Sequence, residues 1–263
     1  MSAMISTANL TKRFVKAPDL AAIIAGKLGA PVSEQVVHAV DGVDLDVKKG
    51  EVVGLVGESG CGKSTIGRMI AGILTPTSGQ IFFKGDDVSA LDPEAAKRAN
   101  LAVQMIFQDP FASLNPRQRV AGVVGEAPLV HGLVARDELN DYVDEMLNRV
   151  GLDPEFKRRY QHQFSGGQRQ RIGIARALAV QPEFLVCDEA IAALDVSIQA
   201  QVLNLFMDLR EEFDLTYLFI SHDLGVVEHI ADRVMIMYLV RIVETASAEQ
   251  LFRAPNHPYA QAL

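Results

Sequence analysis

A glycine-rich run around residue 60 limits the folds open to this chain more than any other feature. It reads Gly57-Glu58-Ser59-Gly60-Cys61-Gly62-Lys63-Ser64 and fits the pattern G-x-x-x-x-G-K-[ST] of a phosphate-binding loop. The three glycines allow the backbone to curl so that successive N–H groups point at one anion. Lys63 can then reach the β- and γ-phosphates of a nucleotide, and the Ser64 hydroxyl is placed to bind Mg²⁺. The run therefore predicts a site for a nucleoside triphosphate.

The segments on both sides of this run supply the strand and the helix that such a loop connects. Residues 51–56 read as a buried strand, with an apolar run after Glu51. A helix is expected to open at Ser64 and Thr65, with apolar residues on one face at positions 66, 69, 70, 73 and 74. The positive N-terminal end of that helix adds to the attraction for phosphate. A chance match in a glycine-rich turn would lack both flanking elements.

Length, charge and cysteine content exclude several classes of protein. The 263 residues suit one large α/β domain with an inserted subdomain, and 49% hydrophobic residues permit a sizeable core. A net charge of −8 argues against a nucleic-acid-binding surface, for which a basic domain is expected. Two cysteines, Cys61 and Cys187, do not suggest a disulfide framework. No secretion signal and no apolar run of about 20 residues is visible, so we expect any membrane part to come from partners.

The rest of the chain alternates predicted strands with predicted helices, which indicates a mostly parallel sheet with functional loops at the carboxyl ends of its strands. Strands are expected at 5–14, 39–47, 80–83, 103–107, 184–187, 217–220, 233–239 and 241–244, and helices at 165–180 and 197–213. Residues 15–35 read as an irregular surface excursion. Residues 109–163 change in texture, from a Pro- and Asn-rich loop to helical patterns, and are interpreted as a helical insertion.

An acidic pair, Asp188-Glu189, ends the apolar run that precedes it. An acidic residue at this place downstream of a phosphate loop is the usual direct or water-mediated partner of Mg²⁺, a role that fits Asp188. Glu189 can hold and polarise a water in line with the γ-phosphorus, as general base or as orienting group. A solvated strand end is the alternative, but four apolar residues lead into the pair and favour the site.

The order of four further motifs resembles the ATP-binding-cassette (ABC) ATPase family over nearly the whole chain, from Leu10 to Leu263. The motifs are Phe164-Ser165-Gly166-Gly167-Gln168, then Phe184 to Glu189, then Ala193-Leu194-Asp195, then His222. The resemblance implies an α/β P-loop NTPase (RecA-like) core with a mostly parallel sheet, an N-terminal antiparallel β subdomain and an inserted α-helical subdomain. It implies one ABC ATP-binding domain over 1–263, with the core at 1–108 and 166–263 and the helical signature subdomain at 109–165.

The resemblance also assigns roles to single residues. Glu189, the switch residue His222 and the Q-loop residue Gln108 would be catalytic, and Ser64, Gln108 and Asp188 would hold Mg²⁺. ATP would be bound by a set of loop residues, namely Gly57, Glu58, Ser59, Gly60, Cys61, Gly62, Lys63, Ser64 and Thr65. Phe14 matches the aromatic residue that stacks on adenine, although a core-facing strand residue is an open alternative.

The signature residues Ser165, Gly166, Gly167 and Gln168, with Asp195, would act on a nucleotide held by another subunit. A second helix N-terminus that attracts anions is best used on a neighbour's nucleotide, because the phosphate loop already serves the chain's own. The expected unit is thus a head-to-tail dimer of identical or paralogous subunits that closes on ATP and opens on hydrolysis.

Three segments resemble one branch of the family, the oligopeptide/dipeptide/nickel importer ATPases. They are residues 107–116, 196–201 and 257–263. This branch implies as partners two transmembrane permease subunits and, indirectly, an extracytoplasmic solute-binding protein, with no nucleic acid. It implies a peripheral location on the cytoplasmic side of the bacterial inner membrane. The transported solute, a peptide or a related solute such as nickel, is not written in this subunit.

The chain departs from the family pattern at three places. Ala190-Ile191-Ala192 stands where Pro-Thr-Ser is usual, which leaves open a nucleotide-gated module with little hydrolysis. Val240 and Ala246 replace common glycines, so the turn at Val240 is expected to differ or to be strained. The sequence stops at Leu263, where relatives commonly continue into a cysteine-containing extension, and is expected to be a truncated or a naturally short form. A soluble ABC protein of DNA repair or translation is disfavoured, because those carry two cassettes or coiled-coil arms.

Overall fold

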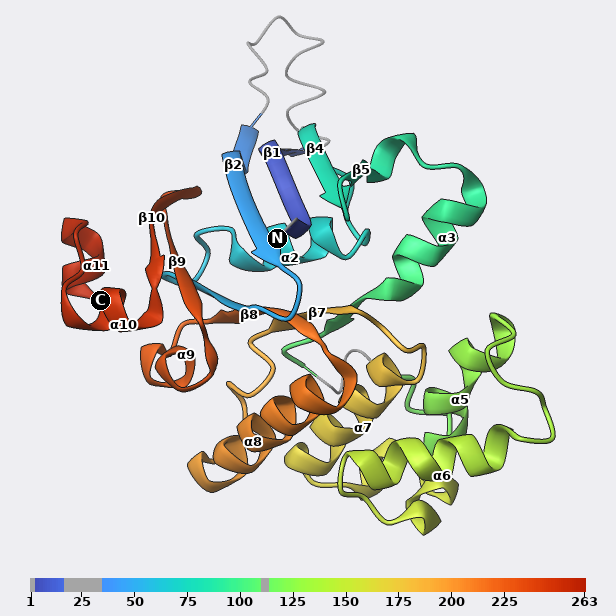
Figure 1. Cartoon of the computed structure of the whole chain (residues 1–263). Coiled ribbons are helices and arrows are strands. Elements are labelled where there is room, and N and C mark those ends of the chain that lie inside the picture. Colours follow the sequence, from blue (N-terminus) through green and yellow to red (C-terminus); the bar gives the residue numbers. More distant parts are fainter. Residues whose placement is uncertain (1–2, 17–34, 110–113) are drawn as a thin grey trace, which may run out of the picture.

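The computed structural model describes residues 3–16, 35–109 and 114–263 (Figure 1). Its strands are β1 (Ala3–Lys16), β2 (Gln35–Lys48), β3 (Val52–Val56), β4 (Ser78–Phe83), β5 (Asp86–Asp87), β6 (Val103–Ile106), β7 (Phe184–Asp188), β8 (Thr216–Ser221), β9 (Arg233–Tyr238) and β10 (Arg241–Ser247). Its α-helices are α2 (Lys63–Ile70), α3 (Pro93–Ala102), α5 (Val120–Val130), α6 (Leu139–Arg149), α7 (Gly166–Leu178), α8 (Val196–Phe213), α9 (Leu224–Ile230), α10 (Ala248–Arg253) and α11 (Pro258–Ala262). Short 3-10 turns lie at η1 (Val88–Ala90), η2 (Pro154–Arg158) and η3 (Gln161–Gln163).

Two sheets share the strands. The smaller sheet has the order β2-β1-β4-β5 and is antiparallel, and the larger has the order β10-β9-β3-β8-β7-β6. In the larger sheet the pairs β3–β8, β3–β9, β7–β8 and β6–β7 are parallel, and only the edge strand β10 runs antiparallel to its neighbour. The expected α/β class, with an antiparallel N-terminal sheet and a mostly parallel second sheet, is confirmed.

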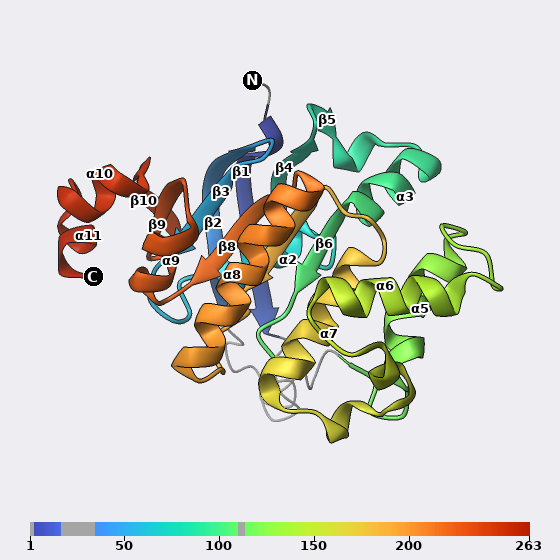
Figure 2. The ribbon, with the colours of Figure 1, turned by 60° about the horizontal axis from the view of Figure 1, so that its bottom comes forward.

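The central strands bury both faces, and the alternation of their side chains divides the core in two. On β3, Val52 and Val56 face one hydrophobic cluster, whereas Val53 and Leu55 face the other. Successive side chains of a strand point to opposite faces, so an unbroken apolar run needs cover on both sides. Helices α7, α8 and α9 supply that cover on one side, and α2 and the smaller sheet supply it on the other. Figure 2 shows α7 and α8 in front of the larger sheet, with β1 and β2 behind it.

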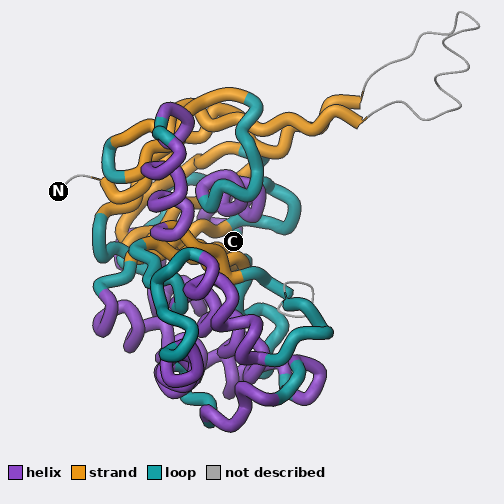
Figure 3. Tube along the Cα trace, turned by 90° about the vertical axis from the view of Figure 1, so that its right-hand side faces the viewer, coloured by secondary structure: helices purple, strands orange, loops and turns teal. Residues whose placement is uncertain are grey.

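The helices α5 and α6 lie to one side of the larger sheet, as Figure 1 shows, and share one hydrophobic cluster with α7 and α8. In Figure 3 most of the helices lie below the strands. The predicted apolar face of α6 is confirmed, because Val143, Leu147 and Val150 are buried and Leu139 packs against them. Both helices lie within the predicted insertion 109–165, but the division of the chain at those boundaries stays a prediction. Among the described residues, no helix combines the length and the apolar character needed to cross a bilayer.

Some element boundaries differ from the prediction. Helix α2 ends at Ile70, and Gly72 follows with a left-handed φ of 69°, so Ile73 is 54% exposed instead of extending the apolar face. β1 and β2 are longer than expected, and most of the predicted irregular excursion at 15–35 lies outside the described residues. β10 continues to Ser247, where Ala246 pairs regularly with Val234.

The hairpin turn between β9 and β10 is strained, one of the two outcomes expected there. Tyr238 pairs with Arg241, which leaves Leu239 and Val240 as a two-residue loop with φ values of 44° and 65°. A two-residue turn with φ above zero at both positions favours Gly or Asn, and a β-branched residue adopts such φ only at a cost.

Candidate functional site

The phosphate loop lies between the end of β3 and the start of α2, where backbone from two other strands leaves no room for side chains. A Cβ atom on Gly57 would lie 2.1 Å from the carbonyl oxygen of Met237 in β9. A Cβ atom on Gly62, the N-cap of α2 with φ 111°, would lie 2.2 Å from the carbonyl oxygen of Ala39 in β2. Both glycines are therefore required by close packing, and this packing fixes the curl of the loop.

Lys63 is buried inside the curl of the loop, with 4% of its surface exposed. Its ammonium group donates hydrogen bonds to the carbonyl oxygens of Gly57, at 2.6 Å, and Glu58, at 2.8 Å. A buried charge needs such partners, because an unpaired ammonium group would lose its hydration without compensation. Lys63 thus stands as a positive charge at the N-terminus of α2, where the helix dipole also favours an anion.

Ser64 and Asp188 face each other across the loop and the end of β7. The Ser64 hydroxyl donates to Oδ1 of Asp188 at 2.6 Å, and the carboxyl residue is 2% exposed. Burial raises the pKa of Asp188 above its ordinary value, although the Ser64 hydrogen bond opposes this effect. Among the described residues only the Ser64 hydroxyl donates to this carboxyl group, while Arg68 and Lys63 act on it from a distance, so the site can accept a cation.

The hydroxyl oxygen of Ser64 and the carboxylate oxygens of Asp188 are suitable ligands for Mg²⁺. In the part of the chain that the structure describes, no three His, Cys, Asp or Glu side chains gather into a complete metal cage. Mg²⁺ does not need one, because it is usually bound through one or two protein oxygens together with substrate phosphates and waters. The Ser64 hydroxyl and the Asp188 carboxylate are two such hard oxygen ligands.

The three predicted catalytic residues lie together, with Glu189 in contact with both Gln108 and His222. Its Oε2 accepts a hydrogen bond from Nε2 of Gln108 at 2.8 Å and lies 3.3 Å from Nδ1 of His222. The three side chains follow β6, β7 and β8, which are neighbours in the sheet and parallel, so their carboxyl ends meet at one edge. The amide of Gln108 donates to Glu189 in this structure, and among the described residues no hydrogen bond joins it to Ser64 or Asp188.

The backbone at Glu189 is held in an unusual conformation. Its φ is 47°, in the left-handed region, and its N–H donates to the carbonyl oxygen of Ile220 in β8 at 3.0 Å. Residues other than glycine are strained there, and such strain gathers at functional sites. The next residues, Ala190 and Ile191, are 2% and 3% exposed and pack into the core, which supports this turn without the usual proline and hydroxyls.

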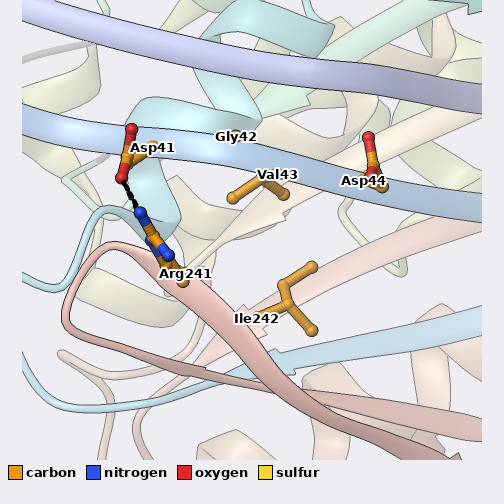
Figure 4. A pocket seen from close by; sticks show the side chains of 6 residues that line it. All are labelled: Asp41, Gly42, Val43, Asp44, Arg241 and Ile242. Atoms are coloured by element: carbon orange, nitrogen blue, oxygen red, sulfur yellow. Dashed lines mark hydrogen bonds and ion pairs between the residues drawn. The ribbon is translucent and has the colours of Figure 1, made fainter.

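A cavity of about 200 Å³ opens onto these groups. It is lined by Ala39, Ser59, Gly60, Gly62, Lys63, Ser64, Thr65, Gln108 and Glu189. A larger hollow of about 340 Å³ lies between β2 and β10, but Asp41 and Asp44 line it (Figure 4). Arg241 in that hollow is already paired with Asp41, so among the described residues no cation there is left for a triphosphate, and the smaller cavity, which contains the phosphate loop and Lys63, is the candidate nucleotide site.

The signature residues lie at the start of α7 and do not line this cavity. Ser165 is the N-cap of the helix, where its Oγ accepts from the Gln168 N–H at 3.4 Å and its own N–H donates to Oε1 of Gln168 at 3.1 Å. Gly167 has no room for a Cβ, which would lie 2.6 Å from Cγ2 of Ile198. Ser165 and Gly166 are exposed, as is Asp195 at the start of α8.

Comparison with known proteins identifies the family. A family model described as ABC transporter matches residues 40–192, more than half of the chain. The chain belongs to the ABC transporter family. This ABC chain is 56% identical over 228 residues to the oligopeptide transport ATP-binding protein AppF of Bacillus subtilis (strain 168), covering 86% of the chain and 69% of AppF. It is 46% identical over 256 residues to the dipeptide transport ATP-binding protein DppF of Escherichia coli (strain K12), covering 97% and 77%.

Solved structures of ABC proteins share the fold. One is cbiO1 of Clostridium perfringens, part of the ABC transporter complex cbiONQ, with a TM-score of 0.76, 25% identity, and coverage of 97% of this chain and 92% of that one. Another is the dimeric ATP-binding cassette MJ0796 in a post-hydrolysis state with ADP and Pi, with a TM-score of 0.76, 26% identity, and coverage of 93% and 99%. The nucleotide in that neighbour agrees with a nucleotide-binding role for the ABC family.

The structure places two residues of the ABC chain, Phe14 and Tyr259, whose positions the sequence analysis left open or did not predict. Phe14 is 43% exposed, so the core-facing alternative is wrong, but the residue does not line the cavity either. Its ring lies 5.2 Å from the ammonium group of Lys12. The residue that sequence reasoning missed is Tyr259 in α11, whose hydroxyl accepts a hydrogen bond from the backbone N–H of Glu58 in the phosphate loop. No spacing rule connects residues that lie 201 positions apart.

Proposed function

We propose that this chain is the ATP-hydrolysing subunit that energises a bacterial ABC importer for peptides. The observation that carries the proposal is the position of Glu189, held by Gln108 and His222 beside the Ser64–Asp188 pair. A carboxylate fixed in this way next to a phosphate loop suits the activation of a water that attacks a γ-phosphate. The peptide class rests on AppF and DppF, whose names state oligopeptide and dipeptide transport.

Each part of the site has a task in this proposal. The loop amides and Lys63 bind the phosphates, which requires the ammonium group to exchange two backbone carbonyls for phosphate oxygens. Ser64 and Asp188 would hold Mg²⁺, which when bound neutralises charge on the phosphate oxygens. Glu189 orients the attacking water and accepts its proton, while Gln108 and His222 fix the carboxylate in place.

The remaining predicted residues have their proposed place in a dimer. Ser165, Gly166 and Asp195 are exposed and lie outside the cavity of their own chain. The exposed N-terminus of α7 suits a phosphate group held by a second subunit, and the dimeric MJ0796 cassette is a solved neighbour. We place the assembled dimer on two permease subunits at the cytoplasmic side of the membrane, with a solute-binding protein outside. The insertion 109–165 would carry the contact to the permease.

The proposal is tested by replacing Glu189 with glutamine, which keeps the shape and removes the base. We expect Glu189→Gln to bind ATP with Mg²⁺ but to release phosphate at least about a hundredfold more slowly, because general-base catalysis supplies 10²–10⁴-fold. The matched control is Glu211→Gln on the exposed side of α8, which we expect to behave as wild type.

The measurements are steady-state phosphate release and binding of labelled ATP. Loss of phosphate release with binding retained supports the proposal. Wild-type protein that binds ATP without releasing phosphate, even with its permease partners, would instead make the chain a nucleotide-gated module. Phosphate release that survives Glu189→Gln would remove Glu189 from its proposed role.

A further inference from the structure

The C-terminal helix α11 reaches back to the phosphate loop through one side chain. The hydroxyl oxygen of Tyr259 accepts a hydrogen bond from the backbone N–H of Glu58 at 3.0 Å. The ring of Tyr259 stacks on Tyr238, the last residue of β9, with 4.2 Å between ring centroids and 29° between ring planes. Burial raises the pKa of Tyr259, so its hydroxyl stays neutral at physiological pH. Figure 1 shows α11 beside the β9–β10 hairpin.

The segment that carries Tyr259 is fixed by hydrogen bonds to β10. The carboxylate of Glu244 accepts from the backbone N–H groups of Asn256 and His257, both at 2.9 Å. Nδ1 of His257 in turn accepts from the N–H of Tyr259 at 3.1 Å and caps α11. These bonds set the position and direction of the tyrosine ring before any ligand arrives.

The β9–β10 hairpin is itself tied to the body of the protein. The N–H of Asp41 in β2 donates to the carbonyl oxygen of Val240 in the turn at 3.1 Å. The Asp41 carboxylate accepts from Nε of Arg241 at 3.0 Å, a contact drawn in Figure 4. The hydroxyl of Tyr259 is therefore held at a fixed position relative to the body of the protein, and so is the Glu58 N–H that it binds.

The contact matters because of what Lys63 must do. In this structure its ammonium group holds the Gly57–Glu58 backbone from inside the loop. When Lys63 turns to a phosphate, both carbonyl oxygens lose that donor, and the bond from Glu58 to Tyr259 remains on the outer side. A loop that keeps its curl presents its amides to phosphate without a further ordering cost.

We propose that Tyr259 is a positioning residue for nucleotide binding, which keeps the phosphate loop in its binding shape while Lys63 moves to the phosphates. The inference rests on the proposed ATP site. It assigns to α11 a task in binding and none in the chemical step, since Tyr259 lies outside the cavity. A neutral hydrogen bond of this kind corresponds to a roughly two- to tenfold change in affinity.

The test compares Tyr259→Phe with wild type in the full chain. Phenylalanine keeps the ring stacked on Tyr238 and removes the hydroxyl that accepts from the Glu58 N–H. We expect the Kd for ATP with Mg²⁺, measured by calorimetry, and the KM for hydrolysis to rise roughly two- to tenfold together. We expect kcat to stay unchanged and the amides of residues 57–62 to exchange hydrogen faster. A general loss of structure would not produce this split between KM and kcat.

The matched control is Tyr142→Phe, which removes a hydroxyl that donates to the Ala179 carbonyl at 2.9 Å, away from the loop. We expect it to leave the Kd for ATP unchanged. A second variant, Glu244→Gln, weakens the anchor of α11 and should raise the Kd in the same way. Combining it with Tyr259→Phe should add little, because both changes act through one contact.

The outcomes separate this inference from the proposed function. If wild-type protein binds and hydrolyses ATP and Tyr259→Phe has the same Kd, the positioning role is overturned and the function stands. A lower kcat at unchanged Kd would also overturn it. If wild-type protein does not bind ATP, the proposed function itself fails.

Discussion

Two residues of this site are held in states that lower the stability of the folded protein when no ligand is bound. Asp188 is buried, and its hydrogen bond from Ser64 only partly replaces water, so its carboxyl group has a raised pKa. Glu189 is held with φ at 47°. Each of these features costs free energy in the absence of a ligand, which is expected where a protein is built to bind charge.

The cost at Asp188 can be measured by removing its charge. We expect Asp188→Asn to unfold at higher denaturant concentration than wild type, by about 1–2 kcal/mol in free energy, because asparagine still accepts from Ser64 without a buried charge. ATP hydrolysis with Mg²⁺ should be lost in the same variant. Asp208→Asn, at an exposed position of α8, is the control for both measurements. A less stable Asp188→Asn protein would contradict the argument.

The clustering of the catalytic residues could be predicted from the sequence, but their individual contacts could not. Gln108, Glu189 and His222 each follow an apolar strand, and parallel strands bring such ends together, so their clustering could be expected. Which atom of Glu189 each one meets depends on side-chain rotamers that no sequence pattern encodes. Tyr259 was missed for a stronger reason, since its contact with Glu58 depends on the packing of the whole C-terminal hairpin.

At the scale of elements, apolar runs predicted the sheet well, and short or half-exposed elements were missed. Helix α3 was not predicted, although Asp92 caps it by accepting from the Ala95 N–H and Pro93 occupies its first position, which together form a recognisable start signal. Its face is poorly apolar, with Ala99 alone fully buried, so periodicity gave no sign of it. β1 and β2 were predicted too short, because a paired hairpin can extend past its buried part.

The β9–β10 turn offers a test at this scale. We expect Val240→Gly to stabilise the protein by about 1 kcal/mol, because glycine adopts a φ of 65° without strain and keeps the carbonyl that Asp41 bonds. As control, Val130→Gly at the exposed end of α5 should cost about 0.5–1 kcal/mol, since that residue is helical. Denaturant unfolding of both variants measures whether the free energy of unfolding rises for Val240→Gly and falls for Val130→Gly. Equal destabilisation would show that the turn carries no strain.

At the scale of the molecule, each of the two active sites of the proposed dimer is made from both chains. Lys63 and Ser165 of one chain would then serve different nucleotides. We expect Lys63→Ala and Gly166→Glu to be inactive alone, the second because a carboxylate would meet the partner's phosphate. Gly166 has open surroundings, with its nearest contact a leucine methyl of Leu194 at 3.6 Å, so the variant should fold.

Mixing the two inactive proteins gives the decisive measurement. In a mixed dimer one site keeps both an intact loop and an intact signature, so up to about a quarter of wild-type phosphate release should return. In the control mixture of Lys63→Ala with Ser64→Ala, the phosphate loop of every site carries one of the two mutations. This mixture should stay inactive. If both mixtures remain inactive, the two motifs do not meet across an interface.

The order of the larger sheet also bears on how the protein is made. Strand β3, which leads into the phosphate loop, pairs with β8 on one edge and β9 on the other, and both come from residues 216–238. A ribosome delivers the N-terminal part first, so β3 waits with both edges bare while some 160 later residues are translated. Nascent chains of this protein are therefore expected to need shielding by chaperones until late in synthesis, and ATP cannot rescue them before β8 and β9 emerge.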